Sequence, residues 1–327
     1  MMTWEARVKA VKGHGFTERQ AGFLVTVMLH AGVCVGRQYC AFARIARGQK
    51  MHDFFGDLVG RGCATAHRFR QHNARLYHVH YRPLYEAIGD PDNRHRKATT
   101  LARAVEKLMV LDAVMAMRDD AEWLATEHDK VAYFTLTRQI PSTVLPALTF
   151  RSDRGETVRH FPDKFPIGIA SDGRNHVFLY LVVRPMPMEF RLFLERHAEL
   201  LRALPEWTVR LLVPRHLGSA ITRYQHAFRE QLGTPLRQPV IEELRSSFQA
   251  RRDGGGHRET RSQRAAHAFA GPRFRALYRT WLERGDVVVD ATISPVLADA
   301  VARRMGRLES HVLPHGYLHL SSLVGTA

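Results

Sequence analysis

The first part of the chain repeats apolar residues at helical spacing in three successive segments. Residues 16–32 place four apolar side chains on one helical stripe: Phe23, Leu24, Val27 and Met28. Thr17 and Gln20 have the spacing of a capping box, which marks the start of this helix. Residues 35–48 and 49–62 show the same spacing, and glycines follow each pattern. The pattern therefore predicts three compact helices in a row.

After residue 62 the spacing of apolar residues changes from about four positions to two. Residues 64–70 and 74–81 alternate polar and apolar side chains, and residues 71–73, Gln-His-Asn, form a plausible turn between them. In the second segment Leu76, His78 and His80 share one face, while the residues between them share the other. Three helices followed by a two-stranded ribbon are the order of elements in a winged helix-turn-helix, and we predict such a domain here.

A longer helix and a boundary follow. Residues 99–117 carry an apolar stripe that suits either packing or a dimer interface: Leu101, Val105, Leu108, Leu111 and Met115. Residues 130–136 read as a strand, and Pro141 and Pro146 mark a boundary. We therefore divide the chain into residues 1–146, a winged-helix domain with its long connecting helix, and residues 147–327.

The second half reads as an α/β domain. Residues 165–170 and 176–183 predict paired strands, and a helix over 187–204 leads into a further strand over 207–214. This strand–helix–strand order predicts a small, partly parallel sheet. Further elements are expected as helices within 219–251, a loop over 251–264, a helix over 271–284, a strand over 286–293 and a helix over 295–307. The predicted fold class is α+β.

Composition narrows the functional classes. The 327 residues hold 48 Lys and Arg against 32 Asp and Glu, a formal net charge of +16, and such a field attracts anionic partners, above all nucleic acid. No run of eighteen apolar residues and no secretory signal occurs, so we expect no membrane partner. Three cysteines without C-x-x-C spacing argue against a disulfide framework and a zinc–thiolate site, and favour a cytoplasmic location.

The predicted ribbon concentrates positive charge. Residues 63–81 contain three arginines, four histidines and no acid. A wing lies against the sugar-phosphate backbone, where arginines bind and carboxylates are repelled. The candidate phosphate ligands are Arg68, Arg70 and Arg75, together with His67 and His72. The alternative is a solvated hairpin whose cations only face water.

Residues 50–59 are the candidate recognition helix. Side chains that read base edges come from its exposed start and from the helix before it. The candidates are Arg37, Gln38, Gln49, Lys50, His52 and Arg61. Asp53 and Asp57 count against a helix fully buried in a groove, since phosphates repel them, and an ordinary core helix with a wet face is the alternative. A second basic cluster, which capping and solubility explain equally well, is Arg94, Arg96, Lys97 and Arg103.

The sequence gives little support for a metal site or for a catalytic site. His78 and His80 would need at least one more ligand besides His67, so we expect no metal and no cofactor. Metal-dependent nucleases of the restriction-endonuclease type place an acid before one strand and an acid with a lysine on the next. Asp163 could be the first acid, but residues 178–183 contain none, unless Asp286 and Asp290 substitute. We assign no catalytic residue.

The order of parts resembles the replication-relaxation family of plasmid and mobile-element proteins. The resemblance rests on "FTERQ" (residues 16–20), "FPDKFPIGI" (161–169), and "HVFLYLVV" followed by a helix and "WTVRLLVP". Members of that family carry an acid in the strand after the turn, where this chain has none. The resemblance implies a DNA-binding accessory factor of a plasmid, integrative element or transposon, with a C-terminal domain that acts as a scaffold.

These observations predict a protein that binds double-stranded DNA and assists site-specific recombination, transposition or plasmid replication. The expected partners are duplex DNA, a recombinase, transposase or replication enzyme, and a second copy of the chain. A winged-helix transcriptional regulator is the first alternative, and a metal-dependent nuclease is the second.

Overall fold

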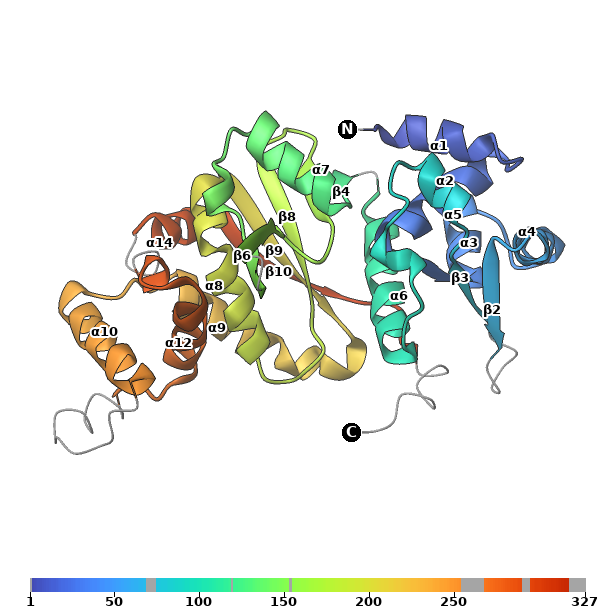
Figure 1. Cartoon of the computed structure of the whole chain (residues 1–327). Coiled ribbons are helices and arrows are strands. Elements are labelled where there is room, and N and C mark those ends of the chain that lie inside the picture. Colours follow the sequence, from blue (N-terminus) through green and yellow to red (C-terminus); the bar gives the residue numbers. More distant parts are fainter. Residues whose placement is uncertain are drawn as a thin grey trace. The chain divides into compact units, whose positions relative to one another are not determined.

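The computed structural model describes residues 2–68, 75–118, 120–152, 155–253, 268–289 and 295–317 (Figure 1). Its fold is α+β with a partly parallel five-stranded sheet, which confirms the predicted class. The chain divides into two compact units. Unit 1 comprises Met1–Ala132, Phe165–Ser171 and Val312–Ala327, and unit 2 comprises Tyr133–Lys164 and Asp172–His311.

Unit 1 is mainly helical at its start. Its elements are α1 (Trp4–Lys12), α2 (Glu18–His30), β1 (Val33–Val35), α3 (Gly36–Ala43), α4 (Gln49–Gly60), β2 (Ala64–Arg68), β3 (Arg75–Val79), α5 (Arg82–Ala87), η1 (Arg94–Arg96), α6 (Leu101–Ala116), β4 (Ala121–Leu124), α7 (Glu127–Ala132) and β7 (Ile167–Ala170). The three predicted helices are therefore confirmed as α2, α3 and α4. The predicted ribbon is confirmed as β2 and β3, and β1 completes an antiparallel sheet in the order β1-β3-β2.

Local signals explain where α2 and α6 begin. Thr17 and Gln20 form the predicted capping box, with the Thr17 amide donating to Gln20 Oε1 at 2.9 Å. The hydroxyl of Thr100 accepts from the Arg103 amide at the start of α6. Leu108 and Leu111 of the predicted apolar stripe are fully buried within unit 1, where α6 packs against α2 and β1.

Unit 2 combines strands with helices from the second half of the chain. Its elements are η2 (Tyr133–Thr137, a π-helical turn), η3 (Ser142–Val144), β5 (Ala147–Ser152), β6 (Gly155–His160), β8 (Asn175–Leu181), α8 (Met188–Ala203), β9 (Glu206–Val213), η4 (Arg215–Ala220), α9 (Ile221–Leu232), α10 (Gln238–Arg252), α12 (Pro272–Arg284), α14 (Pro295–Ala302) and β10 (Gly306–Val312). β5 and β6 form a separate antiparallel hairpin.

The five-stranded sheet has the order β10-β9-β8-β7-β4. β8 and β9 run parallel, with Asn175 opposite Glu206 and Leu181 opposite Leu212, and α8 makes the crossover between them (Figure 1). The predicted strand–helix–strand unit is thus confirmed. Both strands are apolar along most of their length because parallel strands are covered on both faces.

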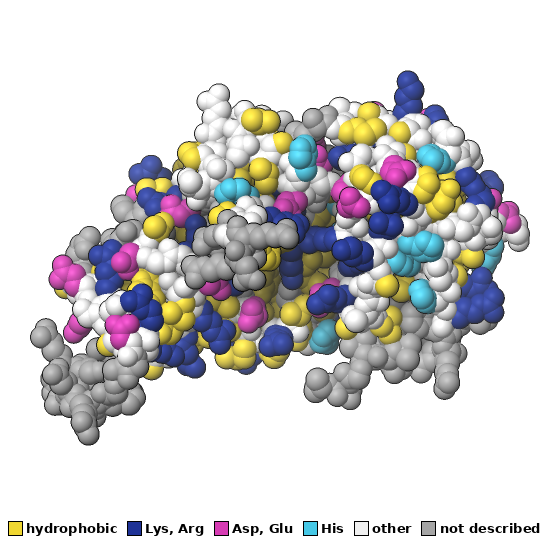
Figure 2. All heavy atoms as spheres, viewed as in Figure 1, with side chains coloured by type: hydrophobic (Ala, Val, Ile, Leu, Met, Phe, Trp, Pro, Cys, Tyr) yellow, Lys and Arg dark blue, Asp and Glu magenta, His cyan; other side chains and the backbone are white. Residues whose placement is uncertain are grey.

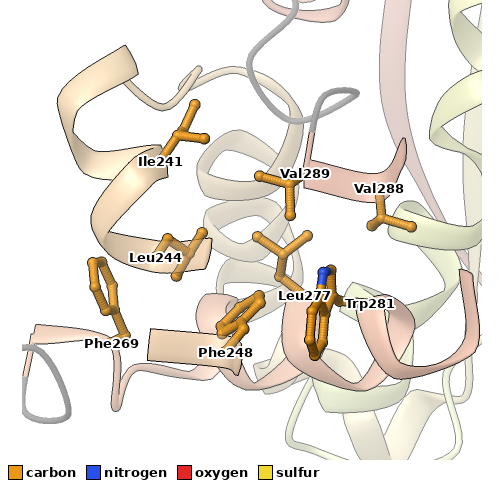
Figure 3. Packing of buried hydrophobic residues seen from close by; sticks show 8 residues of the cluster. All are labelled: Ile241, Leu244, Phe248, Phe269, Leu277, Trp281, Val288 and Val289. Atoms are coloured by element: carbon orange, nitrogen blue, oxygen red, sulfur yellow. The ribbon is translucent and has the colours of Figure 1, made fainter. Parts of the chain in front are cut away.

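A second, smaller core lies among the C-terminal helices of unit 2. Figure 3 shows side chains from α10 and α12 and from the segments beside them pointing toward one another. The residues of this cluster are Ile241, Leu244, Phe248, Phe269, Leu277, Trp281, Val288 and Val289. Each is buried, so these helices pack around their own apolar centre.

Two predicted strands are wrong. Residues 130–136 lie in α7 and η2 instead of a strand; at the start of α7, Thr126 Oγ1 accepts from the Asp129 amide at 3.0 Å. The segment 286–293 is helical at residues 287–289, and residues 290–294 lie outside the described ranges. Short apolar runs suit strands and buried helices alike, and here packing decided. Much of the predicted loop over 251–264 also lies outside the described residues.

The strands β1, β4, β5, β6 and β10 were not predicted. They are only three to seven residues long, and most of them mix polar and apolar residues without a clear period, so no pattern marked them as strands. None of the helices within the described ranges combines the length and apolarity needed to cross a bilayer.

Candidate nucleic-acid interface

An aromatic stack positions α4 on the small sheet of unit 1. Phe54 and Phe55 on α4 are both buried; Phe54 stacks on Tyr39 of α3 with ring centroids 4.2 Å apart, and Phe55 stacks on Tyr77 of β3 at 3.9 Å. Phe23 of α2 closes the cluster edge-on against Tyr39. These contacts fix the orientation of α4, so its opposite face is exposed.

The ribbon register places two arginines directly opposite each other. Arg68 of β2 pairs with Arg75 of β3, and two residues away Ala66 pairs with Tyr77. Side chains two residues apart on a strand share a face. Both arginines therefore lie on the ribbon face that carries Tyr77, which is the face against which α4 packs.

Arg68 and Arg75 are exposed, and neither forms an ion pair with a carboxylate of the described residues. Figure 2 shows Lys and Arg side chains gathered where β2 lies in Figure 1, without Asp or Glu side chains beside them on the visible face. Two like charges directly opposite on a ribbon destabilise it unless an anion lies between them. The predicted ligands Arg70 and His72 lie outside the described residues.

Two arginines that we did not predict precede α4. Arg44 ends α3 in the left-handed conformation, with φ of 53°, and Arg47 follows in the turn to α4. Both side chains are exposed and neither pairs with a described carboxylate. The signal was present in the sequence, since residues 44–50 contain Arg44, Arg47 and Lys50 but no acid.

The exposed face of α4 begins with predicted base-reading candidates. Gln49, Lys50 and His52 are all exposed on its first turn. Gln49 Nε2 donates to Asp53 Oδ1 at 2.6 Å, so this pair must separate before either side chain meets a base edge. Lys50 and His52 carry no such restraint among the described residues.

Arg61 has a structural role at the end of α4. Its guanidinium pairs with Asp57 at 3.2 Å, donates to the His14 carbonyl and lies over the Phe16 ring, 4.3 Å from the centroid. These contacts tie α4 to the α1–α2 connection. They also neutralise Asp57, one of the two acids that counted against a DNA-facing helix.

Gln38 is a correction to the sequence prediction. It is fully buried; its Oε1 accepts from the Val35 amide at 3.1 Å, and its Nε2 donates to the Leu108 carbonyl and to Asp112. Gln38 therefore has no surface to offer a base edge, because its oxygen binds the amide before α3 and its nitrogen joins α3 to α6.

Arg37 is also engaged inside unit 1. One guanidinium nitrogen, Nη2, donates to both carboxylate oxygens of Asp112, at 2.8 and 3.0 Å, and to the Tyr317 hydroxyl at 2.8 Å. Its charge is neutralised by a nearly buried acid. We therefore leave Arg37 and Gln38 out of the interface. Their partners on α6 and at Tyr317 lie far away along the chain, so local spacing gave no sign of these interactions.

The second basic cluster lies around the start of α6. Arg94, Lys97 and Arg103 are exposed, while Arg96 is half-buried and donates from Nε to the Pro91 carbonyl at 3.1 Å. Lys107, which we did not predict, joins them. Burial lowers the pKa of Lys107 to about 8, and Arg94 and Arg103 contribute to that lowering, which shows that positive charges crowd here.

The histidines of the ribbon have polar neighbours within the protein. His78 Nε2 lies 3.1 Å from the His95 carbonyl, and His80 Nε2 lies 2.8 Å from Thr65 Oγ1. Burial is the main cause of the lowered pKa of His78, with His80, Lys107 and His67 adding to it. His67 is exposed on the same ribbon face as these two rings.

By their positions in the chain, the acids considered for a nuclease all belong to unit 2. Asp163 is buried beside His197 of α8, whose Nε2 is 2.8 Å from the Pro162 carbonyl. Asp286 accepts from Trp281 Nε1 at 2.8 Å, and Asp290 lies outside the described residues. Within the described ranges no three His, Cys, Asp or Glu side chains are grouped as metal ligands.

Comparisons with protein-family models, with curated proteins and with solved structures found no match for this chain.

Proposed function

We propose that unit 1 binds duplex DNA as a winged helix, with α4 as the recognition helix and β2–β3 as the wing. The order α2, β1, α3, α4, β2, β3 with a three-stranded antiparallel sheet supports this assignment. In that arrangement the second helix of the pair enters the major groove, and the ribbon lies along the backbone.

The pairing of Arg68 with Arg75 carries the proposal. Two exposed guanidinium groups face the same way from opposite strands, and no described carboxylate offsets them. Repulsion between them costs stability that a protein recovers when a phosphate bridges the pair. Arginine suits this role because its planar fork donates two parallel hydrogen bonds to phosphate oxygens.

The start of α4 adds both attraction and selectivity. Arg44, Arg47 and Lys50 supply phosphate contacts near the helix N-terminus, which itself favours an anion. Gln49 and His52 are the exposed side chains with hydrogen-bonding groups for base edges. Sequence preference therefore comes from α4, and sequence-independent affinity comes from the arginines.

Salt-dependent DNA binding tests the proposal. Replacement of Arg68 by Gln should weaken binding to every duplex alike, and the slope of log affinity against log salt should fall by about 0.9 for each phosphate that the variant no longer binds. Arg82→Gln is the matched control, because that exposed arginine already pairs with Glu86 at 2.9 Å. Equal slopes for the two variants would remove the ribbon from the interface.

The biological role of this binding is proposed from the resemblance noted above. A DNA-binding accessory protein of a mobile element, assisting recombination, transposition or plasmid replication, would protect a specific site of that element in a footprint. A transcriptional regulator would protect an operator near its own gene instead. A nuclease would cut the duplex with magnesium and stop when a chelator is added.

A further inference from the structure

One edge of the five-stranded sheet gathers the carboxyl ends of parallel strands. β8 and β9 are parallel, and the Val182 amide donates to the Leu212 carbonyl where both strands end. β10 runs the same way, since Trp207 bonds to Met305 and Arg210 pairs with Glu309 further along both strands. In α/β sheets this edge is where ligands bind.

Four basic side chains follow these strand ends. Arg184 comes three residues after β8, Arg215 and His216 begin η4 just after β9, and Arg223 lies on the first turn of α9; all four are exposed. The Tyr224 hydroxyl donates to the Arg184 carbonyl at 2.9 Å. This bond brings the start of α9 beside the segment that follows β8.

The two ends of the strands differ in how their charges are balanced. At the amino ends, Glu206 pairs with Arg174 at 3.4 Å and with Arg307 at 3.9 Å. At the carboxyl ends, none of the four basic side chains pairs with a carboxylate of the described residues. Glu189, on the first turn of α8, is an acid of this region: burial is the main cause of the raised pKa of Tyr180, Glu189 adds to it and Arg184 opposes it.

The net charge of unit 2 is also positive. Its sequence holds 28 Lys and Arg against 18 Asp and Glu, a net +10, whereas unit 1 holds 20 against 14, a net +6. The larger share of the positive excess therefore lies outside the winged helix. A ligand with a continuous row of phosphates is attracted by both units.

We propose that the carboxyl edge of β8 and β9, with Arg184, Arg215, His216 and Arg223, is a second binding surface for the phosphodiester backbone of duplex DNA. The edge reads no base sequence; its arginines hold phosphate oxygens. This surface belongs to unit 2 and goes beyond the DNA binding proposed for unit 1. It makes the protein a two-site DNA binder.

The test is fluorescence anisotropy of the full chain on a labelled duplex of about 20 base pairs, between about 50 and 200 mM salt. The variant Arg184→Gln/Arg215→Gln/Arg223→Gln should lower the magnitude of the salt slope by about 2.7, on the basis of about 0.9 for each phosphate contact. The control variant, with equal loss of charge on exposed arginines of unit 2, is Arg237→Gln/Arg275→Gln/Arg279→Gln. The control should keep the slope of the natural chain.

Equal slopes for the two triple variants would overturn the proposal. Loss of binding to phosphatidylglycerol vesicles with an unchanged DNA slope would also overturn it and assign the edge to lipid phosphates. Circular dichroism checks that the variants fold. If the triple variant does not fold, the single variant Arg223→Glu replaces it, and this change should also lower the salt slope.

The outcome is separable from that of the winged-helix proposal. Arg68→Gln and the unit 2 triple variant are measured on the same duplex, singly and combined. If unit 1 does not bind DNA, Arg68→Gln leaves the slope unchanged while the triple variant still lowers it. If both surfaces bind, the two reductions add, because the residues share no partner.

Discussion

The Phe55 ring on α4 and the Tyr77 ring on β3 lie stacked, with centroids 3.9 Å apart and planes inclined by 14°. Both side chains are buried. This contact joins the helix that we propose reads DNA to the ribbon that we propose binds its backbone. Together with the stacking of Phe54 on Tyr39, this contact sets the angle between the two parts of the interface.

Removal of this stack should destabilise unit 1. We expect Phe55→Ala to lower the free energy of unfolding by about 3–5 kcal/mol, because the substitution deletes a fully buried aromatic ring and leaves a cavity. Urea denaturation followed by circular dichroism measures the change. Val59→Ala on the exposed side of the same helix is the control and should cost less than about 1 kcal/mol. Similar losses for both variants would show that the stack contributes little.

Gln38 and Gln49 should respond in opposite ways. Gln38→Ala removes the oxygen that accepts from the Val35 amide and one of the donors to the Leu108 carbonyl, so we expect a loss of about 1–3 kcal/mol in stability. The folded variant should bind DNA like the natural chain. Gln49→Ala, at an exposed position, should change stability by less than about 0.5 kcal/mol and alter the preferred DNA sequence. Denaturation and a binding-site selection test the pair; a changed preference in the Gln38 variant contradicts the structure.

The stability of unit 2 should depend on the protonation of Glu195. Burial raises the pKa of this carboxyl from 4.5 to about 7, although Gln231, Arg273 and Arg191 act to lower it. The folded state therefore holds the proton more tightly than the unfolded state does. The resulting stabilisation is complete below about pH 4.5 and is lost as the pH rises from there to about 7.

The variant Glu195→Gln checks this dependence. A glutamine keeps an oxygen that accepts from Gln231 Nε2 but cannot ionise. The natural chain should lose on the order of 3 kcal/mol between about pH 5 and pH 8 relative to the variant, since one pKa unit corresponds to about 1.4 kcal/mol. Parallel pH profiles for the two proteins would mean that Glu195 does not titrate in this range.

Local patterns predicted the elements that rest on strong periodicity. The capping box at Thr17 and Gln20, the helices α2, α4, α6 and α8 and the parallel pair β8 and β9 all follow from apolar spacing and capping residues. The same patterns failed at residues 130–136, where an apolar run became helical. A short apolar run satisfies either geometry, so its neighbours decide.

For the candidate site, too, local properties were predictable from the sequence and long-range contacts were not. The sequence by itself determined that a cationic segment without acids follows three helices, because charge and alternation are local properties. Only the tertiary structure decided which cations are available: Arg37 is neutralised by Asp112, 75 positions away, and Gln38 is buried by α6. It also set Arg68 opposite Arg75. Burial and long-range ion pairs depend on how distant segments pack, which no local spacing encodes. The register of a ribbon also depends on the geometry of its turn, which the alternation of polar and apolar residues does not specify.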